Sequence, residues 1–279
     1  CAPGSFLIHE GRKMTVTVPY VLPIEKGPNF RDLGGYQTTD GRTIKYHKLI
    51  RSGRMNKLSD QDLAFLTDYG VRTIIDLRSP KEKQQWPDRV PAGARYELNS
   101  IFPTDETQVS KSIVELRKLY DKDPVAGFMN MVNTYRDMVS RGSAQRAFHH
   151  FFEILCAHDQ DNDAVLYHCT SGKDRTGMAT VYLLTVLGVP AATIRADYLL
   201  SNPLLHKNRR DRIAALRAAD SNSALIATTR SLASVRNEYL DAALVKIEDD
   251  YGSLPDYIEN QLGVDNQMQA QLRQIYLKR

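Results

Sequence analysis

Short apolar runs, each closed by polar or turn residues, recur along the first two thirds of the chain and predict β-strands. Three of them span residues 49–52, 72–77 and 164–168, and such runs are typical of strands buried on both faces of a sheet. A fourth segment, residues 15–22, contains Pro19. Because proline cannot donate to the hydrogen-bond ladder, this segment predicts an edge strand.

Helical periodicity fills the interval between the first two of these runs. Ser59 is placed to cap a helix that continues to about Tyr69 and ends at Gly70, since serine caps helix starts and glycine ends them. Residues 49–77 therefore predict a compact βαβ unit.

Most of the remaining chain also has helical periodicity. Residues 109–158 predict helices with breaks near residues 123–124 and 141–142, and residues 176–187 predict a helix that ends at Gly188. The last part, residues 190–279, is almost entirely helical. Its predicted breaks lie near Pro203, residues 221–223, Gly252 and Gly263.

This order of elements predicts an α/β fold: a mostly parallel central sheet with helices on both faces, followed by a helical C-terminal third. The chain has 279 residues, of which 42% are hydrophobic and 25% charged, which is close to globular averages. Residues 1–279 therefore predict a single domain. No stretch approaches the ~18 apolar residues that span a membrane, so no transmembrane segment is expected.

The charge balance excludes general nucleic-acid binding but not a local basic site. There are 37 Lys and Arg against 33 Asp and Glu, a net charge of +4, whereas nucleic-acid-binding domains carry a strong basic excess. Residues 206–212, His-Lys-Asn-Arg-Arg-Asp-Arg, form a basic helical cluster. It is interpreted either as a charged surface or as a face at a site mouth that attracts acidic substrates.

The three cysteines, Cys1, Cys156 and Cys169, are too few for a disulfide framework. Cys156 lies in an apolar helical run and is interpreted as a core residue. The start Cys-Ala-Pro-Gly is how a bacterial lipoprotein begins after signal-peptide removal; the alternative is a boundary or tag remnant. The compartment therefore stays open between a secreted or lipid-anchored protein and a cytoplasmic one, and the oligomeric state stays open as well.

The strongest chemical signal is the loop between the strand at 164–168 and the helix at 176–187. Residues 168–177 read His-Cys-Thr-Ser-Gly-Lys-Asp-Arg-Thr-Gly, with five residues between Cys169 and Arg175. A tight strand-to-helix loop directs successive backbone N–H groups inward and adds the partial positive charge of the helix start. We therefore expect a phosphate group to be bound by the loop. Its phosphate-binding residues would be Thr170, Ser171, Gly172, Lys173, Asp174, Arg175 and Thr176.

The residue types in this loop predict a nucleophilic mechanism. The donors that bind phosphate would also lower the pKa of the Cys169 thiol, and its thiolate could then attack phosphorus. Arg175 offers a planar fork for two phosphate oxygens, in the transition state as well. The Thr176 hydroxyl could help the sulfur to leave, and Gly172 gives the loop its backbone freedom.

Other interpretations of the loop fit less well. A buried cysteine beside a coincidental Gly-Lys would not explain the position of Arg175, and an ATP-type phosphate loop would need its first Gly at Tyr167 and a Ser or Thr at Asp174. Sulfur transferases and arsenate reductases also place a cysteine in an anion loop but do not explain the Lys-Asp-Arg-Thr continuation. A non-catalytic phosphate-binding module usually lacks the nucleophile or the arginine, and both are present.

Cysteine, five residues, arginine and threonine is the signature of protein tyrosine phosphatases, and residues 168–177 resemble an atypical bacterial branch of that family. Residues 29–35, Asn-Phe-Arg-Asp-Leu-Gly-Gly, resemble its N-terminal motif, and residues 76–78, Asp-Leu-Arg, resemble its motif after a central strand. The resemblance covers about residues 29–200. It implies the cysteine-dependent phosphatase fold and hydrolysis of phosphotyrosine, with phosphoinositides as alternative substrates, and a C-terminal third that folds as a lid. The substrate is then a phosphorylated protein or a phosphoinositide.

Three aspartates compete as the acid that protonates the leaving oxygen: Asp174, Asp76 and, least favoured, Asp88. Asp174 lies in the loop itself and is favoured by the family resemblance; Asp76 ends a strand at the carboxyl edge of the sheet, where such sites lie. The alternative role of Asp174 is to orient Arg175 or a water molecule. The alternative role of Asp76 is an ion pair with Arg78 or Arg31. Trp86-Pro87-Asp88 has the letters of the acid loop of classical tyrosine phosphatases, but it lies far before Cys169 and is interpreted as an ordinary turn.

No metal or organic cofactor is expected. His149 and Glu153 are four residues apart on a helical stretch, but a zinc site needs more converging ligands than these two. The stretch is interpreted as a solvated helix face. Lys173 would suit a substrate with several phosphates, because it adds a second positive charge to the loop.

Overall fold

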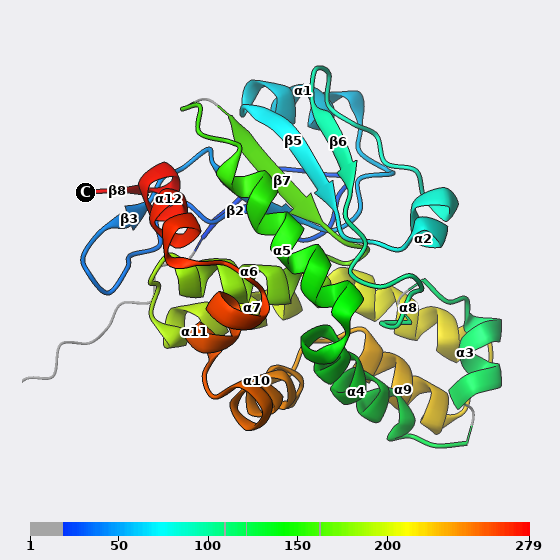
Figure 1. Ribbon diagram of the computed structural model, residues 1–279. Coiled ribbons are helices and arrows are strands. Elements are labelled where there is room, and N and C mark those ends of the chain that lie inside the picture. The colour runs from blue at the N-terminus through cyan, green and yellow to red at the C-terminus, as the bar shows by residue number, and fades with distance from the viewer. Residues whose placement is uncertain (1–18, 109, 121, 162) are drawn as a thin grey trace, which may run out of the picture.

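A central six-stranded sheet organises the protein in the computed structural model, which describes residues 19–108, 110–120, 122–161 and 163–279 (Figure 1). Its strands, in spatial order, are β1 (Tyr20–Val21), β2 (Arg31–Asp32), β4 (Leu49–Ser52), β7 (Ala164–His168), β5 (Val71–Asp76) and β6 (Arg95–Leu98). The pairings of β4 with β7, β7 with β5 and β5 with β6 are parallel, whereas β1–β2 and β2–β4 are antiparallel. The predicted mostly parallel sheet is therefore confirmed.

Side chains of the central strands alternate between two hydrophobic cores, as the period of a strand requires. Val165 and Ile75 lie in the larger core. Leu166 and Ile74 lie in the smaller core on the opposite face, together with Leu66 of the helix α1 (Asp60–Asp68). The two sets are fully buried, which explains why these strands have continuous apolar sequences. Helices on both faces of the sheet are thus confirmed.

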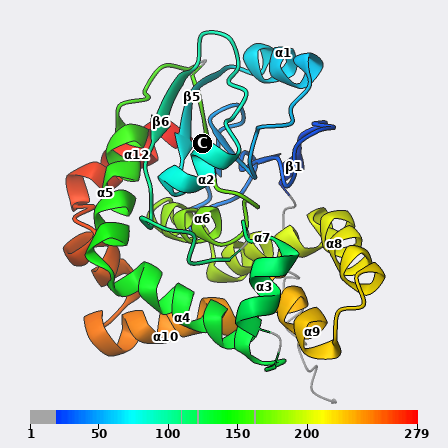
Figure 2. The same ribbon diagram turned by 90° about the vertical axis from the view of Figure 1, so that its right-hand side faces the viewer.

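The larger core is covered by helices from the middle and the end of the chain (Figure 1). After α2 (Pro80–Gln85), the helices are α3 (Ile113–Tyr120), α4 (Ala126–Ser140), α5 (Gly142–Cys156), α6 (Arg175–Val186), α7 (Ala191–Leu204), α8 (His206–Ala218), α9 (Ser223–Leu232), α10 (Asn237–Tyr251), α11 (Leu254–Asp256), the π-helix Tyr257–Gln261 and α12 (Asn266–Tyr276). Figures 1 and 2 show α3, α4, α8 and α9 grouped beyond the carboxyl ends of β5 and β7.

Most predicted elements appear at or near their expected positions. The strands at 49–52 and 164–168 have the predicted bounds, and Ser59 caps α1 through a reciprocal capping box with Asp62. Of the segment 15–22, residues 15–18 lie outside the described residues, while Tyr20 and Val21 form β1 at the sheet edge. Cys1 also lies outside them. Cys156 is partly buried and packs against the larger core.

Some expectations about connectivity were wrong. The strands β4 and β5 are not neighbours, because β7 lies between them, so residues 49–77 do not form a unit of adjacent strands. The predicted break near Pro203 is confirmed, since α7 ends at Leu204 and Leu205 separates it from α8, although Pro203 itself lies inside α7. The last residues are not helical: β8 (Leu277–Lys278) pairs with β3 (Thr43–Ile44). Two-residue strands have no periodicity to detect, which is why β2, β3 and β8 were missed.

Among the residues that the structure describes, no helix combines the length and the apolar character needed to cross a membrane. The single-domain organisation stays a prediction.

Candidate active site in the loop after strand β7

The loop from Cys169 to Asp174 leaves the central strand β7 and leads directly into α6, whose first residue is Arg175. Gly172 has a φ of +67°, and a Cβ atom on it would lie 2.3 Å from the Ser52 carbonyl oxygen. Any side chain would therefore clash with the backbone of β4 as well as strain the left-handed conformation. The predicted tight strand-to-helix loop is present.

Side chains from the first part of the sheet hold this loop from beneath. The Asn29 amide donates to the carbonyl oxygens of Ser171 and Gly172, at 3.2 and 2.8 Å, and Arg51 donates to Gly172 O at 2.9 Å. These hydrogen bonds satisfy both carbonyls and tie the loop to the neighbouring part of the chain. The segment 29–35, singled out by its motif, thus contributes a supporting residue.

A buried carboxylate anchors this support. Asp197 of α7 pairs with Arg31 at 2.9 Å and with Arg51 at 2.5 Å, and it accepts a hydrogen bond from Tyr36 at 3.1 Å. Burial alone would raise the pKa of Asp197, but the two guanidinium groups lower it below its usual value. Asp197 was missed in the sequence, because nothing local distinguishes it from a surface aspartate of a helix.

Cys169 lies at the base of the loop and is 2% exposed. Burial opposes ionisation, but the charge of Arg175 and hydrogen bonds from the Thr176 side chain and backbone more than offset it, so the pKa of the thiol is lowered. The buried Thr176 hydroxyl has no nitrogen or oxygen partner among the described residues. The site therefore favours a thiolate, the nucleophilic form of cysteine.

Arg175 is held by a carboxylate that the sequence did not reveal. Its two terminal nitrogens donate to the two oxygens of Glu82 at 2.7 and 2.8 Å, and the Thr170 hydroxyl also donates to Glu82. Burial raises the pKa of Glu82, but Arg175 and these hydrogen bonds lower it to about 2. The buried Nε atom of Arg175 has no partner among the described residues, which leaves a donor for a bound oxyanion.

Glu82 also caps the start of α2, and this second role has a signal in the sequence. Ser79 and Glu82 form a reciprocal capping box at the start of α2, a pattern recognisable as Ser-Pro-Lys-Glu. The pattern predicts a helix start after the Asp76 strand, but not that the carboxylate also reaches the loop.

Lys173 and Asp174 are both buried and paired with each other. Lys173 Nζ donates to Asp174 at 2.6 Å and to the Ser234 carbonyl at 3.5 Å, and the Tyr135 hydroxyl donates to the other Asp174 oxygen at 3.0 Å. Lys173 therefore points toward the segment after α9. The expectation that Lys173 offers a second positive charge in the loop to a substrate with several phosphates does not fit this buried, paired placement.

Asp76 is in a buried ionic cluster beside the loop rather than within it. Both of its oxygens accept hydrogen bonds from Arg78, at 2.8 to 3.1 Å, as its alternative role predicted. Asp88 also pairs with Arg78 and accepts a hydrogen bond from the Met55 N–H at 2.8 Å. The interpretation of Asp88 as an ordinary turn residue was wrong: its side chain is buried, and only the tertiary fold brings it to Arg78.

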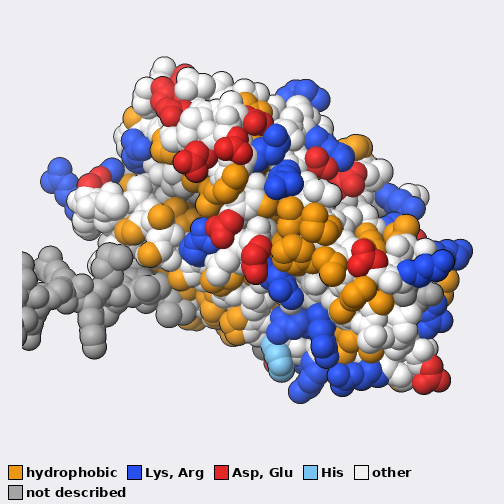
Figure 3. Space-filling view, turned by 90° about the horizontal axis from the view of Figure 1, so that it is seen from below, with side chains coloured by type: hydrophobic (Ala, Val, Ile, Leu, Met, Phe, Trp, Pro, Cys, Tyr) orange, Lys and Arg blue, Asp and Glu red, His pale blue; other side chains and the backbone are white. Residues whose placement is uncertain are grey.

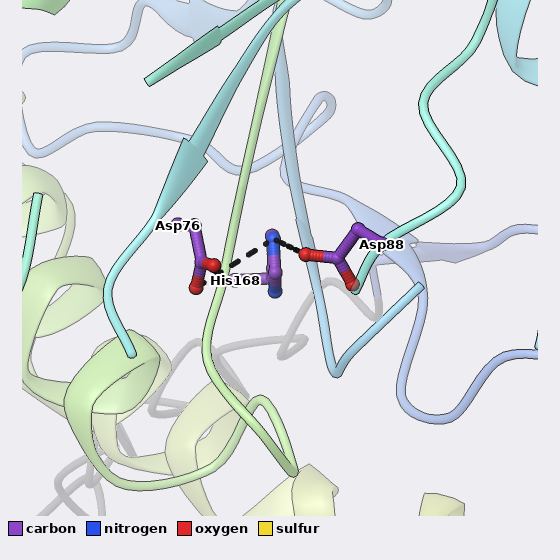
Figure 4. Close-up of side chains that lie close together, drawn as sticks. All are labelled: Asp76, Asp88 and His168. Atoms are coloured by element: carbon purple, nitrogen blue, oxygen red, sulfur yellow. Dashed lines mark ion pairs between the residues drawn. The ribbon is translucent and has the colours of Figure 1, made fainter. Parts of the chain in front are cut away.

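His168 completes this cluster (Figure 4). Its Nε2 atom lies 3.9 Å from Asp76 and 3.3 Å from Asp88, and the three side chains point toward one another. Burial would lower the pKa of His168, but the two carboxylates raise it. The cluster has the spacing of a metal site, but Arg78 already bonds both carboxylates. The raised pKa of His168 favours its charged form, which together with Arg78 would balance the two acidic charges.

The mouth of the site is basic. A cavity of about 200 Å³ is lined by Thr170 and Ser171 of the loop, by Arg54, and by Arg209 and Arg212 of α8. Part of the cluster at residues 206–212 therefore faces the mouth, through Asn208, Arg209 and Arg212, as the second interpretation proposed. By contrast, His149 and Glu153 form a partly exposed pair at 3.4 Å on α5, away from the loop.

Comparison with known proteins finds tyrosine phosphatases, both by family model and among similar sequences. A model of the tyrosine phosphatase family matches residues 22–278. A provisionally named tyrosine-protein phosphatase of Cupriavidus necator is 34% identical over 249 residues, covering 89% of this chain and 85% of that protein. The triple specificity protein phosphatase PtpB of Mycobacterium tuberculosis is 30% identical over 257 residues, covering 83% and 90%.

Among solved structures, a variant of TpbA from P. aeruginosa in complex with phosphotyrosine covers 74% of this chain and 89% of its own. The TM-score is 0.28 and the sequence identity 13%, which is too weak a likeness to inform on fold or function.

Proposed function

Because this chain belongs to the tyrosine phosphatase family, we propose that it hydrolyses phosphotyrosine in proteins through a phosphocysteine intermediate on Cys169. One observation carries the proposal: a thiol with a lowered pKa lies in an anion-binding loop beside a buried arginine that keeps one donor without a partner. That combination supplies the nucleophile and the electrophilic support that phosphoryl transfer needs.

In the first step the Cys169 thiolate attacks phosphorus, and the sulfur–phosphorus bond forms as the bond to the tyrosine oxygen breaks. Arg175 binds a phosphoryl oxygen through the transition state with its Nε donor, which has no partner among the described residues, while Glu82 holds its two terminal nitrogens in place. The leaving oxygen takes a proton from Asp174 and departs as neutral tyrosine.

In the second step water attacks phosphorus and gives a proton to Asp174, and the sulfur–phosphorus bond breaks. The departing thiolate is stabilised by the Thr176 hydroxyl, which is buried and has no nitrogen or oxygen partner among the described residues. Inorganic phosphate leaves, and Asp174 is protonated again for the next turnover.

The position of Asp174 supports it rather than Asp76 as the acid. Asp174 directly precedes Arg175 in the loop, whereas Asp76 lies in the ionic cluster beside it. Side-chain donors hold both carboxylates: Tyr135 and Lys173 bind Asp174, and Arg78 binds Asp76.

Phosphoinositides are the second substrate class we propose. The observation in their favour is the mouth, where Arg209 and Arg212 of α8 lie across a cavity from Thr170. Arginine side chains at this position would pair with additional phosphate groups of a substrate. The Mycobacterium tuberculosis relative is named a triple specificity phosphatase, which agrees with a range of substrates wider than phosphotyrosine.

The test compares initial rates on a phosphotyrosine peptide, a phosphoserine peptide and a soluble phosphoinositide at equal concentrations, for wild type and Cys169→Ser. We expect the highest kcat/KM on phosphotyrosine and no turnover by Cys169→Ser, with binding of inorganic phosphate retained. Turnover by the variant within a fewfold of wild type would refute the phosphocysteine mechanism. Phosphate binding by an inactive wild-type protein would instead identify a non-catalytic phosphate-binding module.

A further inference from the structure

A second, larger cavity lies on the other side of α8 from the active-site mouth. Its volume is about 620 Å³, and its walls come from the end of α7, from α8, and from the end of α9 with the segment that follows it. The basic residues that line it are His206, Arg209, Arg210, Arg217, Arg230 and Arg236. Figure 3 shows Lys and Arg side chains gathered around a histidine on the face seen from below.

The positive charge of this cavity is not neutralised by acidic residues in its lining. None of the described residues that line it is acidic. Arg217 and Arg230 are exposed, and no ion pair or side-chain hydrogen bond joins either to a residue of the described chain. Among the described residues, Arg209 donates to the Asn202 carbonyl at 3.4 Å, and Arg210 lies 3.8 Å from Asp211. Five arginines therefore line this cavity without a carboxylate among the described lining residues, and such a concentration of positive charge attracts an anion.

The walls of the cavity are fixed. Asn202 and Val235 exchange two hydrogen bonds, at 2.9 and 3.0 Å, which tie the segment after α9 to α7. Val235 and Ile213 are buried and give the cavity an apolar base. Guanidinium groups above an apolar floor bind phosphate more strongly than the same groups in open solvent, because water is excluded from one side.

The cavity is directly connected to the catalytic loop. Arg209 lines both cavities, the mouth above Thr170 and the second cavity. Ser234, another lining residue, accepts a hydrogen bond from Lys173 of the loop. One ligand that crosses α8 at Arg209 could therefore occupy the catalytic loop and the second cavity together.

We propose that this cavity is a second anion-binding site, which takes a second phosphorylated side chain of the peptide substrate whose phosphotyrosine is bound at Cys169. The inference rests on the proposed function for its first phosphate and names the substrate class: peptides with two phosphorylated residues. Arginine suits this role because its planar fork binds phosphate bidentately.

A peptide fits the cavity better than a membrane surface does. None of the large exposed hydrophobic side chains of the described residues lines the cavity, so no apolar group is placed there to enter a bilayer. The site is an open groove between helices, along which a flexible peptide can place one phosphorylated side chain.

The test uses Arg217→Gln/Arg230→Gln, which removes two exposed charges outside the active-site mouth. The matched control is Arg72→Gln/Arg279→Gln, which removes the same charge from exposed arginines that line neither cavity. Substrates are two peptides of one sequence, with phosphotyrosine alone or with an added phosphoserine at several spacings, and a small aryl phosphate. Wild type is expected to prefer the doubly phosphorylated peptide by roughly tenfold in kcat/KM, mostly through KM, as about 1.4 kcal/mol of added binding requires.

The double variant is expected to lose this preference while the control keeps it, with the aryl phosphate turned over equally by all three proteins. Absence of a preference at every spacing, or a preference that survives in the double variant, overturns the proposal. Binding to phosphatidylserine vesicles is measured as well. If the double variant loses only this vesicle binding and keeps the peptide preference, the proposal is overturned and the cavity is assigned to a membrane.

Binding separates this proposal from the proposed function. In the Cys169→Ser background, fluorescence anisotropy of the same labelled peptides should show the tenfold preference and its loss with Arg217→Gln/Arg230→Gln. That result would stand even if the wild-type protein failed to hydrolyse phosphotyrosine, whereas equal affinities for the two peptides would overturn the second site alone.

Discussion

Replacement of Glu82 by glutamine tests whether a carboxylate from α2 sets the geometry of the catalytic arginine. Glu82 is 1% exposed and holds both terminal nitrogens of Arg175. Glutamine has nearly the same shape but only one acceptor oxygen and no charge. Glu82→Gln therefore leaves Arg175 buried without its full counter-charge, the situation in which a broken buried pair is most costly.

The stability effect follows from the pKa. The pKa of Glu82 is about 2 instead of the usual 4.5, a difference that corresponds to ~3 kcal/mol. Since the folded-state pKa is depressed, this stability is fully present above pH 4.5 and is lost as the pH falls toward 2. Urea denaturation should show Glu82→Gln less stable by ~3 kcal/mol at pH 7, with the gap narrowing below pH 4.5.

The catalytic effect should appear in kcat. Loss of one transition-state donor costs ~10² to 10³ in rate, and Glu82 acts through Arg175, so we expect a fall of roughly 10- to 100-fold in kcat with a smaller change in KM. The control is Glu248→Gln, the same chemical change at an exposed position of α10. If Glu82→Gln matched this control in both stability and kcat, the argument that the buried pair positions Arg175 would be refuted.

Three further predictions concern the loop and its acid. Arg175→Lys should lower kcat/KM on phosphotyrosine by at least ~100-fold, because an ammonium group cannot reproduce the bidentate fork; rates within a fewfold of wild type would contradict this. Asp174→Asn should lose ~10² to 10⁴ in rate on poor leaving groups and less on an activated aryl phosphate, with loss of the basic limb of the pH–rate profile. The opposite result, with Asp76→Asn giving that pattern, would assign the acid to Asp76. Gly172→Ala places a Cβ 2.3 Å from the Ser52 oxygen, so thermal unfolding should show a large loss of stability, and a melting temperature equal to that of wild type would disprove the tight packing.

Local sequence was sufficient for the parts of the protein that depend on near neighbours. The strand at 164–168, the loop from Cys169 to Arg175 and the helix after it are consecutive, so their order alone predicted a phosphate-binding loop. Apolar runs predicted the central strands because burial on both faces needs apolar residues at every position. Gly172 was expected to give a tight loop its freedom, and its positive φ agrees.

Tertiary structure alone decided which distant side chains support the loop. Glu82 reaches Arg175 across 93 positions of the chain, and Arg51 reaches Asp197 across 146. Such pairs follow from the strand order, in which β7 inserts between β4 and β5, and a single sequence holds no local signal for that order. The role of Asp88 could not be predicted from the sequence for the same reason. Its neighbours in sequence resemble a turn, but its carboxylate pairs with Arg78 and His168, which only the folded chain brings to it.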